Sequence, residues 1–154
     1  MTAHYARNGR DIWTYLHFGG TELSITVGEA GDLAAALEKA CHVPPYGITF
    51  DFNRTTLRPD SEGVLQRILG LLQRDPPLAV EVQGHTDNVG GDDYNMTLSQ
   101  GRADAVKAWL VSHGIAAARI TTRGYGRQQP IAPNDSDEGR AKSRRVELAR
   151  AGCK

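Results

Sequence analysis

The segment LAVEVQGHTDNVGGDDYNMTLSQGRADAVKAWLVSH, residues 78–113, predicts the centre of the fold. Its first part alternates: Val80 and Val82 face one way and the polar residues between them face the other, as in a β-strand with one buried face. A glycine-rich loop follows, and then a long helix that begins near Asp92 and is closed by Gly114. A strand joined by a short loop to a long helix indicates an α/β arrangement.

Strands and helices alternate on both sides of this segment. Upstream, we expect a strand over residues 46–53 and a helix that begins at Pro59 and ends before Asp75. Downstream, we expect a strand, a helical turn and a closing strand over residues 118–126, 138–142 and 144–150. The order β-α-β-α-β-β predicts an α/β fold (an α+β sandwich), with helices packed on one face of a mixed four-stranded sheet.

Residues 1–45 are expected to form an N-terminal extension. Two runs rich in β-branched and aromatic residues, DIWTYLHF and TELSITVGEA, flank Gly19-Gly20 and predict a hairpin. The next run, GDLAAALEKACHV, predicts a short helix capped by Asp32 and ended by Pro44-Pro45. The extension is too small for a core of its own, so it packs on the main domain or is the tail of a preceding one. Residues 46–150 then form the main domain and 151–154 a C-terminal tail.

Composition and charge exclude several classes of protein. With 154 residues, 40% of them hydrophobic, the chain is expected to form about one globular domain. The formal net charge is zero, so no overall field attracts nucleic acid. The basic C-terminal run GRAKSRRVELARAGCK lacks interleaved aromatic residues and predicts a strand, which also argues against a nucleic-acid partner. No apolar run approaches the roughly 20 residues that span a bilayer.

The two cysteines, Cys41 and Cys153, lie far apart in the chain and neither has the spacing of a metal ligand. We expect two unpaired thiols, with a single disulfide as the alternative.

The central segment contains residue types that also serve catalysis and metal binding. Ser99 and His85 could act as nucleophile and base, but no G-x-S-x-G elbow surrounds the serine and no carboxylate pair is singled out. His85 lacks a second ligand at helical spacing, and the loop lacks the oxygen pattern of a calcium site. We therefore expect no catalytic residue, no metal and no cofactor, and interpret His85 as a residue that packs at the end of a strand.

Arg102 is the anomaly of the long helix. It falls on or beside the apolar stripe formed by Leu98, Ala105, Val106, Trp109 and Leu110. A guanidinium there is costly unless a carboxylate pairs with it, and Asp87 ends the preceding strand. Two interpretations stay open. The two residues form a structural salt bridge, or they stay apart and bind an amino-acid zwitterion. In the second case Asp87 accepts from the ligand's ammonium and Arg102 donates to the ligand's carboxylate. Spacing alone favours the salt bridge.

Four motifs then resemble the OmpA-like peptidoglycan-binding domain. They are G-H-T-D, N-x-x-L-S-x-x-R-A, G-Y-G and E-G-R-A-x-x-R-R-V-E, in this order, and the similarity extends from about Tyr46 to Leu148. That domain occurs in outer-membrane proteins, peptidoglycan-associated lipoproteins and flagellar stator proteins. The resemblance implies non-catalytic binding of peptidoglycan through the meso-diaminopimelate of its stem peptide, whose side chain ends in an ammonium and a carboxylate.

The resemblance also implies roles for individual residues. Asp87 and Arg102 match the family's ligand-binding aspartate and arginine, which reverses the ranking that spacing suggested. The positions that line the family's pocket match Thr86, Asn88 and Leu98. Its opposite wall matches Asp51, Phe52 and Asn53. The position near the ligand's peptide matches Arg145.

Two positions depart from the family pattern. Ser143 stands where the family usually has asparagine, which puts the loop hydrogen bonds of that asparagine in doubt. Gly101 stands in mid-helix, where glycine costs about 0.5–1 kcal/mol relative to alanine.

The cellular setting that the resemblance implies is the periplasm of a Gram-negative bacterium, in association with the outer membrane. Membrane contact is expected only through a segment outside this chain, and the oligomeric state stays open between monomer and dimer. A flagellar stator-type anchor, a secretion-system wall anchor and a wall-modifying hydrolase are the alternatives.

Overall fold

The computed structural model describes the backbone of residues 2–7, 10–19, 22–29 and 33–153, and the side chains of residues 33–153. The strands are β1 (Thr2–Arg7), β2 (Arg10–Gly19), β3 (Glu22–Glu29), β4 (His42–Val43), β5 (Val80–Gly84), β6 (Ile120–Gly124) and β7 (Val146–Arg150). The helices are α1 (Leu33–Ala40), α2 (Glu62–Arg74), α3 (Asp92–Ser112) and α4 (Asp137–Ser143), and short 3-10 turns precede α2 and β6.

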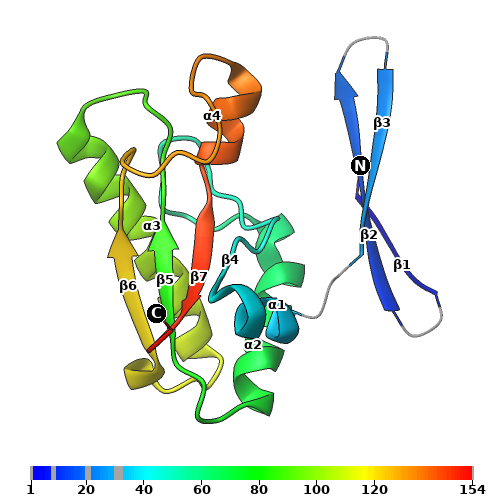
Figure 1. The fold of residues 1–154 in the computed structure, drawn as a ribbon, viewed down its shortest axis with the longest axis vertical. Helices are drawn as coiled ribbons and strands as arrows, with labels where there is room; N and C mark the ends of the chain where they lie inside the picture. The colour runs from blue at the N-terminus through cyan, green and yellow to red at the C-terminus, as the bar shows by residue number, and fades with distance from the viewer. Residues whose placement is uncertain (1, 8–9, 20–21, 30–32, 154) are drawn as a thin grey trace.

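The main body is built on a four-stranded sheet in the order β4-β7-β5-β6 (Figure 1). Strands β5 and β6 run parallel, whereas β7 is antiparallel to both β5 and β4, so the sheet is mixed. Helix α3 lies across β5 and β6, and α2 packs beside it. The predicted α/β fold with a mixed four-stranded sheet is therefore confirmed.

The predicted N-terminal hairpin is also confirmed, as β2 and β3, which pair antiparallel with Leu16 opposite Ile25. Strand β1 adds to the free side of β2, and within the described residues these three strands pair only with one another. The predicted short helix is α1, but its expected cap, Asp32, lies outside the described residues.

The core forms where α2 meets the sheet. The predicted stripe of α2 is buried over its whole length, at Val64, Leu65, Ile68, Leu71 and Leu72. It packs in one cluster with Val80 and Val82 of β5 and Leu148 of β7. Each fully buried side chain of this size stabilises the fold by about 1.5–3 kcal/mol.

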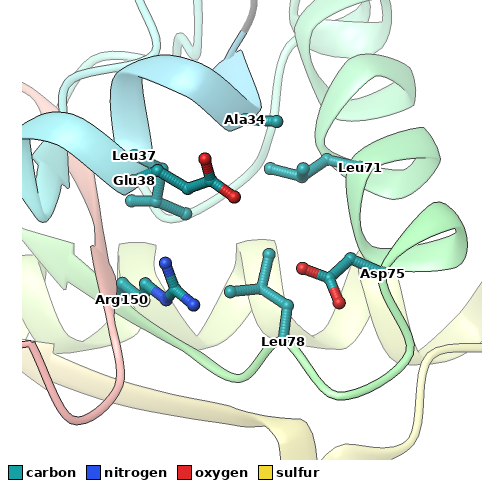
Figure 2. Close-up of a pocket in the computed structure, with 7 residues that line it drawn as sticks. All are labelled: Ala34, Leu37, Glu38, Leu71, Asp75, Leu78 and Arg150. Atoms are coloured by element: carbon teal, nitrogen blue, oxygen red, sulfur yellow. The ribbon is translucent and has the colours of Figure 1, made fainter.

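Helix α1 closes one end of this core beside α2 and β7. Figure 2 shows the small cavity left between α1, α2 and Arg150, with Leu37 and Leu71 on its wall. Its volume is about 10 Å³, room for about one water molecule. This cavity is therefore a packing gap and does not qualify as a ligand site.

The strand predicted over residues 46–53 is wrong. The edge strand is His42–Val43, and the later segment makes only a single bridge between Phe50 and Leu57. Pro44 and Pro45 have no N–H to donate to a ladder. Further along, the Thr49 N–H donates to Ser61 Oγ at 2.8 Å, so it bonds to the start of α2 instead of to a neighbouring strand.

The expectation of two unpaired thiols is also wrong. Cys41 and Cys153 form a disulfide with a Cα–Cα distance of 5.7 Å. Arg150 N–H donates to the Cys41 carbonyl at 2.8 Å, so the end of β7 lies against the residue before β4. This antiparallel pairing of the two strands brings the chain end to Cys41.

The inward face of α3 differs from the predicted stripe. A Cβ on Gly84 would lie 2.0 Å from the Ser99 carbonyl oxygen, and one on Gly124 would lie 2.6 Å from the Gln100 nitrogen. These two glycines let the helix backbone rest directly on β5 and β6. The buried positions are consequently Asn95, Ser99, Arg102, Ala103, Val106 and Leu110, whereas Leu98, Ala105 and Trp109 are only half-buried.

Candidate ligand-binding site

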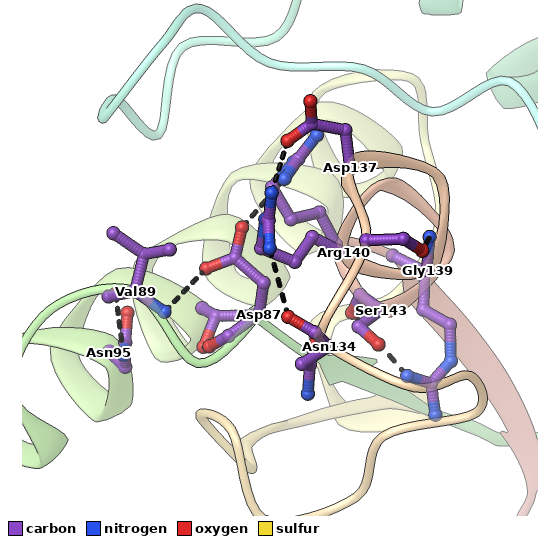
Figure 3. A network of polar contacts seen from close by, with 12 residues as sticks. Asp87, Val89, Asn95, Asn134, Asp137, Gly139, Arg140 and Ser143 are labelled. Atoms are coloured by element: carbon purple, nitrogen blue, oxygen red, sulfur yellow. Dashed lines mark hydrogen bonds and ion pairs between the residues drawn. The ribbon is translucent and has the colours of Figure 1, made fainter.

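Asp87 is held rigidly just beyond the end of β5. Asp87 is only 8% exposed. Its Oδ1 accepts a hydrogen bond from the Val89 N–H at 3.0 Å, and its Oδ2 accepts one from Arg144 Nη1 at 2.6 Å (Figure 3). The loop that follows is tied down in turn, because Asn95 Nδ2 donates to the Val89 carbonyl at 3.0 Å. Asp87 is thus a carboxylate whose position is fixed by hydrogen bonds to both of its oxygens.

Arg102 is the second buried charge, also 8% exposed. Its Nε donates to the Arg54 carbonyl at 3.1 Å, and its guanidinium carbon lies 5.1 Å from the centre of the Phe50 ring, a cation–π contact. Burial lowers the pKa of Arg102 from its ordinary value, and the neighbouring Arg144 lowers it further, against the opposing effects of Tyr94 and Asp87. Over residues 33–153, the Nη groups of Arg102 donate to no protein acceptor.

The salt bridge between Asp87 and Arg102 that spacing favours is not formed; the carboxylate pairs with Arg144. The side chain that sequence reasoning missed is therefore Arg144. No local period could have identified it, because Arg144 lies at the end of α4, before β7 begins. Its neighbour Arg145 makes other contacts: Nε pairs with Glu147 at 2.5 Å, and Nη1 donates to the Gln129 carbonyl at 3.0 Å.

The other predicted residues take different positions around this pair. Thr86 is buried; its N–H donates to the Gly126 carbonyl at 2.9 Å and its hydroxyl to the Asp87 carbonyl at 3.0 Å. Leu98 is half-buried and Asn88 is exposed. Thr86 therefore anchors the backbone of Asp87, whereas Asn88 is exposed to solvent.

The predicted opposite wall, residues 51–53, is a tight turn. The Arg54 N–H closes it on the Asp51 carbonyl at 3.0 Å, and Asn53 has a left-handed φ of 52°. Phe52 is 89% exposed, an unusual position for a large apolar side chain. The Arg54 carbonyl, which accepts from Nε of Arg102, brings this turn to the buried guanidinium.

A groove of about 310 Å³ adjoins Asp87 on the side of Arg144. Residues 44–49 form one wall, including the exposed Tyr46, and residues 138–146 form the other. Arg144 lines this groove while its Nη1 contacts Asp87, and Arg145 lines it as well.

His85, next to this site, is a packing residue in the structure. It is 1% exposed and stacks on Tyr125 with the ring centres 5.2 Å apart. Neither ring nitrogen has a hydrogen-bond partner within the described part of the chain. Burial, and then the positive charge of Arg145, lower the pKa of His85 to about 4, against the opposing charge of Glu147. His85 is therefore neutral at pH 7.

This pKa predicts that the protein loses stability in mild acid. Between the folded-state pKa of about 4 and the unfolded value of 6.5, the unfolded chain binds the extra proton, so stability falls as pH falls. From pH 7.5 to pH 5 the loss from His85 alone is about 2 kcal/mol. Urea unfolding of the wild type and of His85→Phe, which keeps a ring against Tyr125, measures the difference; an equal pH dependence of both proteins would contradict it.

Over the part of the chain with described side chains, no group of three or more His, Cys, Asp or Glu residues is arranged to hold a metal ion. Among the described residues, none of the helices combines the length and the apolar character required to cross a membrane.

The sequence of this chain is similar to that of several known proteins. A family model described as the OmpA family matches residues 49–144. Outer membrane porin F of Pseudomonas fluorescens is 46% identical over 102 residues, which cover 66% of this chain and 31% of the porin. The probable lipoprotein YiaD of Escherichia coli is 45% identical over 104 residues, 68% of this chain and 48% of the lipoprotein. The chain thus spans less than half the length of either relative.

Among solved structures, the peptidoglycan-associated lipoprotein from Burkholderia pseudomallei is similar at a TM-score of 0.63 with 29% sequence identity. The match covers 67% of this chain and 87% of the lipoprotein chain.

Proposed function

The chain belongs to the OmpA family, and from this premise we propose that it binds peptidoglycan without cleaving it. The proposed ligand is the side-chain end of meso-diaminopimelate, held between Asp87 and Arg102. The observation that carries the proposal is the buried guanidinium of Arg102, whose Nη donors have no acceptor among the described residues. The similar lipoprotein from Burkholderia pseudomallei, which is named for its association with peptidoglycan, supports peptidoglycan as the polymer that is bound.

Each of the two charged side chains would bind the oppositely charged group of the ligand. Arg102 presents the planar fork that matches a carboxylate with two parallel hydrogen bonds. Asp87 accepts from the ammonium, and Arg144 orients that carboxylate by donating a hydrogen bond to it. Thr86, Asn88 and Leu98 are proposed to line the pocket. Residues 51–53 are proposed to form its opposite wall, and Arg145 to lie near the peptide in the adjoining groove.

One such pocket should bind with modest strength. Each charge-assisted hydrogen bond is worth about 1.5–3 kcal/mol, from which the costs of desolvation and of ordering the ligand are subtracted. We expect a dissociation constant of about micromolar order for a single fragment. The wall polymer repeats the ligand many times, so weak single sites still retain an anchored protein through multivalency.

The proposed role is an anchor between the envelope and the cell wall, with residues 46–150 as the binding unit. The Cys41–Cys153 disulfide suits an oxidising compartment outside the cytoplasm. We therefore propose a periplasmic location and association with the outer membrane through chain outside this sequence. The relatives named as an outer membrane porin and a lipoprotein support this location.

Sedimentation with diaminopimelate-type wall sacculi tests the proposal. The wild type should appear in the pellet and release no soluble wall fragments, whereas a hydrolase would release them. Asp87→Asn keeps the shape of the side chain but removes its charge, and should weaken binding by about 10- to 100-fold. Asp135→Asn, at an exposed carboxylate of the 127–136 loop, is the matched control and should sediment as the wild type does. Equal sedimentation of all three proteins would overturn the assignment of Asp87.

A further inference from the structure

Gly101, directly before Arg102 in α3, lies under a neighbouring loop. A Cβ added there would lie 2.6 Å from Thr55 Cγ2 and 3.6 Å from Thr55 Cβ. Real Cβ atoms essentially never come as close as 2.6 Å, so any side chain at this position would displace the Thr55 methyl group. A glycine in mid-helix costs stability, and the close approach of Thr55 supplies a physical reason for it here.

The loop that carries Thr55 is internally braced. Asp51 N–H donates to the Thr56 carbonyl at 3.2 Å, and the bridge between Phe50 and Leu57 closes the loop at its base. Because of this bracing, a push on Thr55 moves its neighbours as well. The neighbour that matters is Arg54, whose carbonyl accepts from Arg102 Nε at 3.1 Å.

We infer that Gly101 is a positioning residue for Arg102, because the absence of a side chain there leaves room for the loop of Thr55 against the helix. The absent side chain lets the loop settle on α3, and the settled loop places the Arg54 carbonyl against Nε of Arg102. With Nε occupied by the Arg54 carbonyl and the Phe50 ring in contact with the guanidinium, the Nη groups are the donors left for a ligand carboxylate. The effect of Gly101 on ligand binding rests on the proposed function of Arg102.

A pair of variants tests this inference. Gly101→Ala should displace the loop and weaken binding of a diaminopimelate-containing muropeptide by about five- to tenfold, the cost of misaligning one charge-assisted hydrogen bond. Adding Thr55→Ala removes the Cγ2 atom and leaves an ordinary 3.6 Å contact between the two Cβ atoms. The double variant should therefore recover wild-type affinity, and Thr55→Ala alone should bind within about twofold of the wild type.

A second measurement follows the arginine directly and needs no ligand. In ¹⁵N-correlated NMR spectra, the Arg102 Nε–H signal should shift and exchange faster in Gly101→Ala, and return in the double variant. A signal and an affinity that are both unchanged in Gly101→Ala would overturn the inference, and so would a loss that Thr55→Ala fails to rescue. If the wild type binds no muropeptide, the proposed function fails, while the NMR comparison still decides whether Gly101 positions Arg102.

Discussion

Replacing Arg102 with leucine is expected to weaken binding of a diaminopimelate-containing muropeptide by about a hundredfold while the protein stays folded. The variant removes the bidentate pair of charge-assisted hydrogen bonds that we propose between Arg102 and the ligand carboxylate, each worth about 1.5–3 kcal/mol before solvation costs are subtracted. The fold should tolerate the change because Arg102 is buried and makes no ion pair among the described residues, so leucine removes a desolvated charge.

Two matched variants separate geometry from charge at this position. Arg102→Lys keeps the positive charge but loses the planar fork, so it should bind less tightly than the wild type and more tightly than Arg102→Leu. Arg74→Leu removes an exposed arginine near the end of α2 and should leave binding unchanged. Isothermal titration calorimetry measures all four proteins, with circular dichroism to verify folding. A folded Arg102→Leu variant with wild-type affinity would show that the carboxylate is bound elsewhere.

Removing the Cys41–Cys153 disulfide is expected to lower the free energy of unfolding by about 3–5 kcal/mol. The cross-link joins residues separated by 112 positions, and so restricts most of the unfolded chain. It also fixes the end of β7 beside the residue before β4, since Arg150 donates to the Cys41 carbonyl. A loss of this size is a large part of the 5–15 kcal/mol typical of a single domain.

Urea unfolding of the wild type, with and without reductant, measures the contribution of this disulfide. The variant Cys41→Ser/Cys153→Ser should match the reduced wild type and show no response to reductant. The m-value should rise on reduction, because the unfolded chain expands once the cross-link is gone. A midpoint that is the same for oxidised and reduced wild type would contradict the prediction.

The parts of the fold that could be predicted from sequence are those with a strong local period. The stripe of α2 is buried as expected, and so are Val80 and Val82 of β5, but the polar face of β5 is not open as its alternation predicts, because Gln83 is buried too. The edge strand could not be predicted, because the pairing of Thr49 depends on Ser61, twelve positions away, which accepts its N–H. The disulfide was missed for a related reason: only the pairing of β4 with β7 brings Cys153 to Cys41.

The candidate site likewise has one feature that could be predicted from sequence and others that could not. A buried arginine was predictable from the helical period alone, and the structure buries Arg102. Its relation to Asp87 was not predictable, because spacing does not reveal that Arg144 reaches the same carboxylate from the end of α4. The face that α3 buries was equally hidden, since it follows from the close approach of the Ser99 backbone to Gly84 on another element.

We propose that Arg102 binds the carboxylate that diaminopimelate has and lysine lacks. Calorimetric titration of the wild type and Arg102→Leu with two muropeptides that differ only in that carboxylate tests this proposal. The wild type should prefer the diaminopimelate fragment by about a hundredfold, and Arg102→Leu should bind both fragments with similar, weak affinity. Equal binding of the two fragments by the wild type, or an undiminished preference in Arg102→Leu, would contradict it.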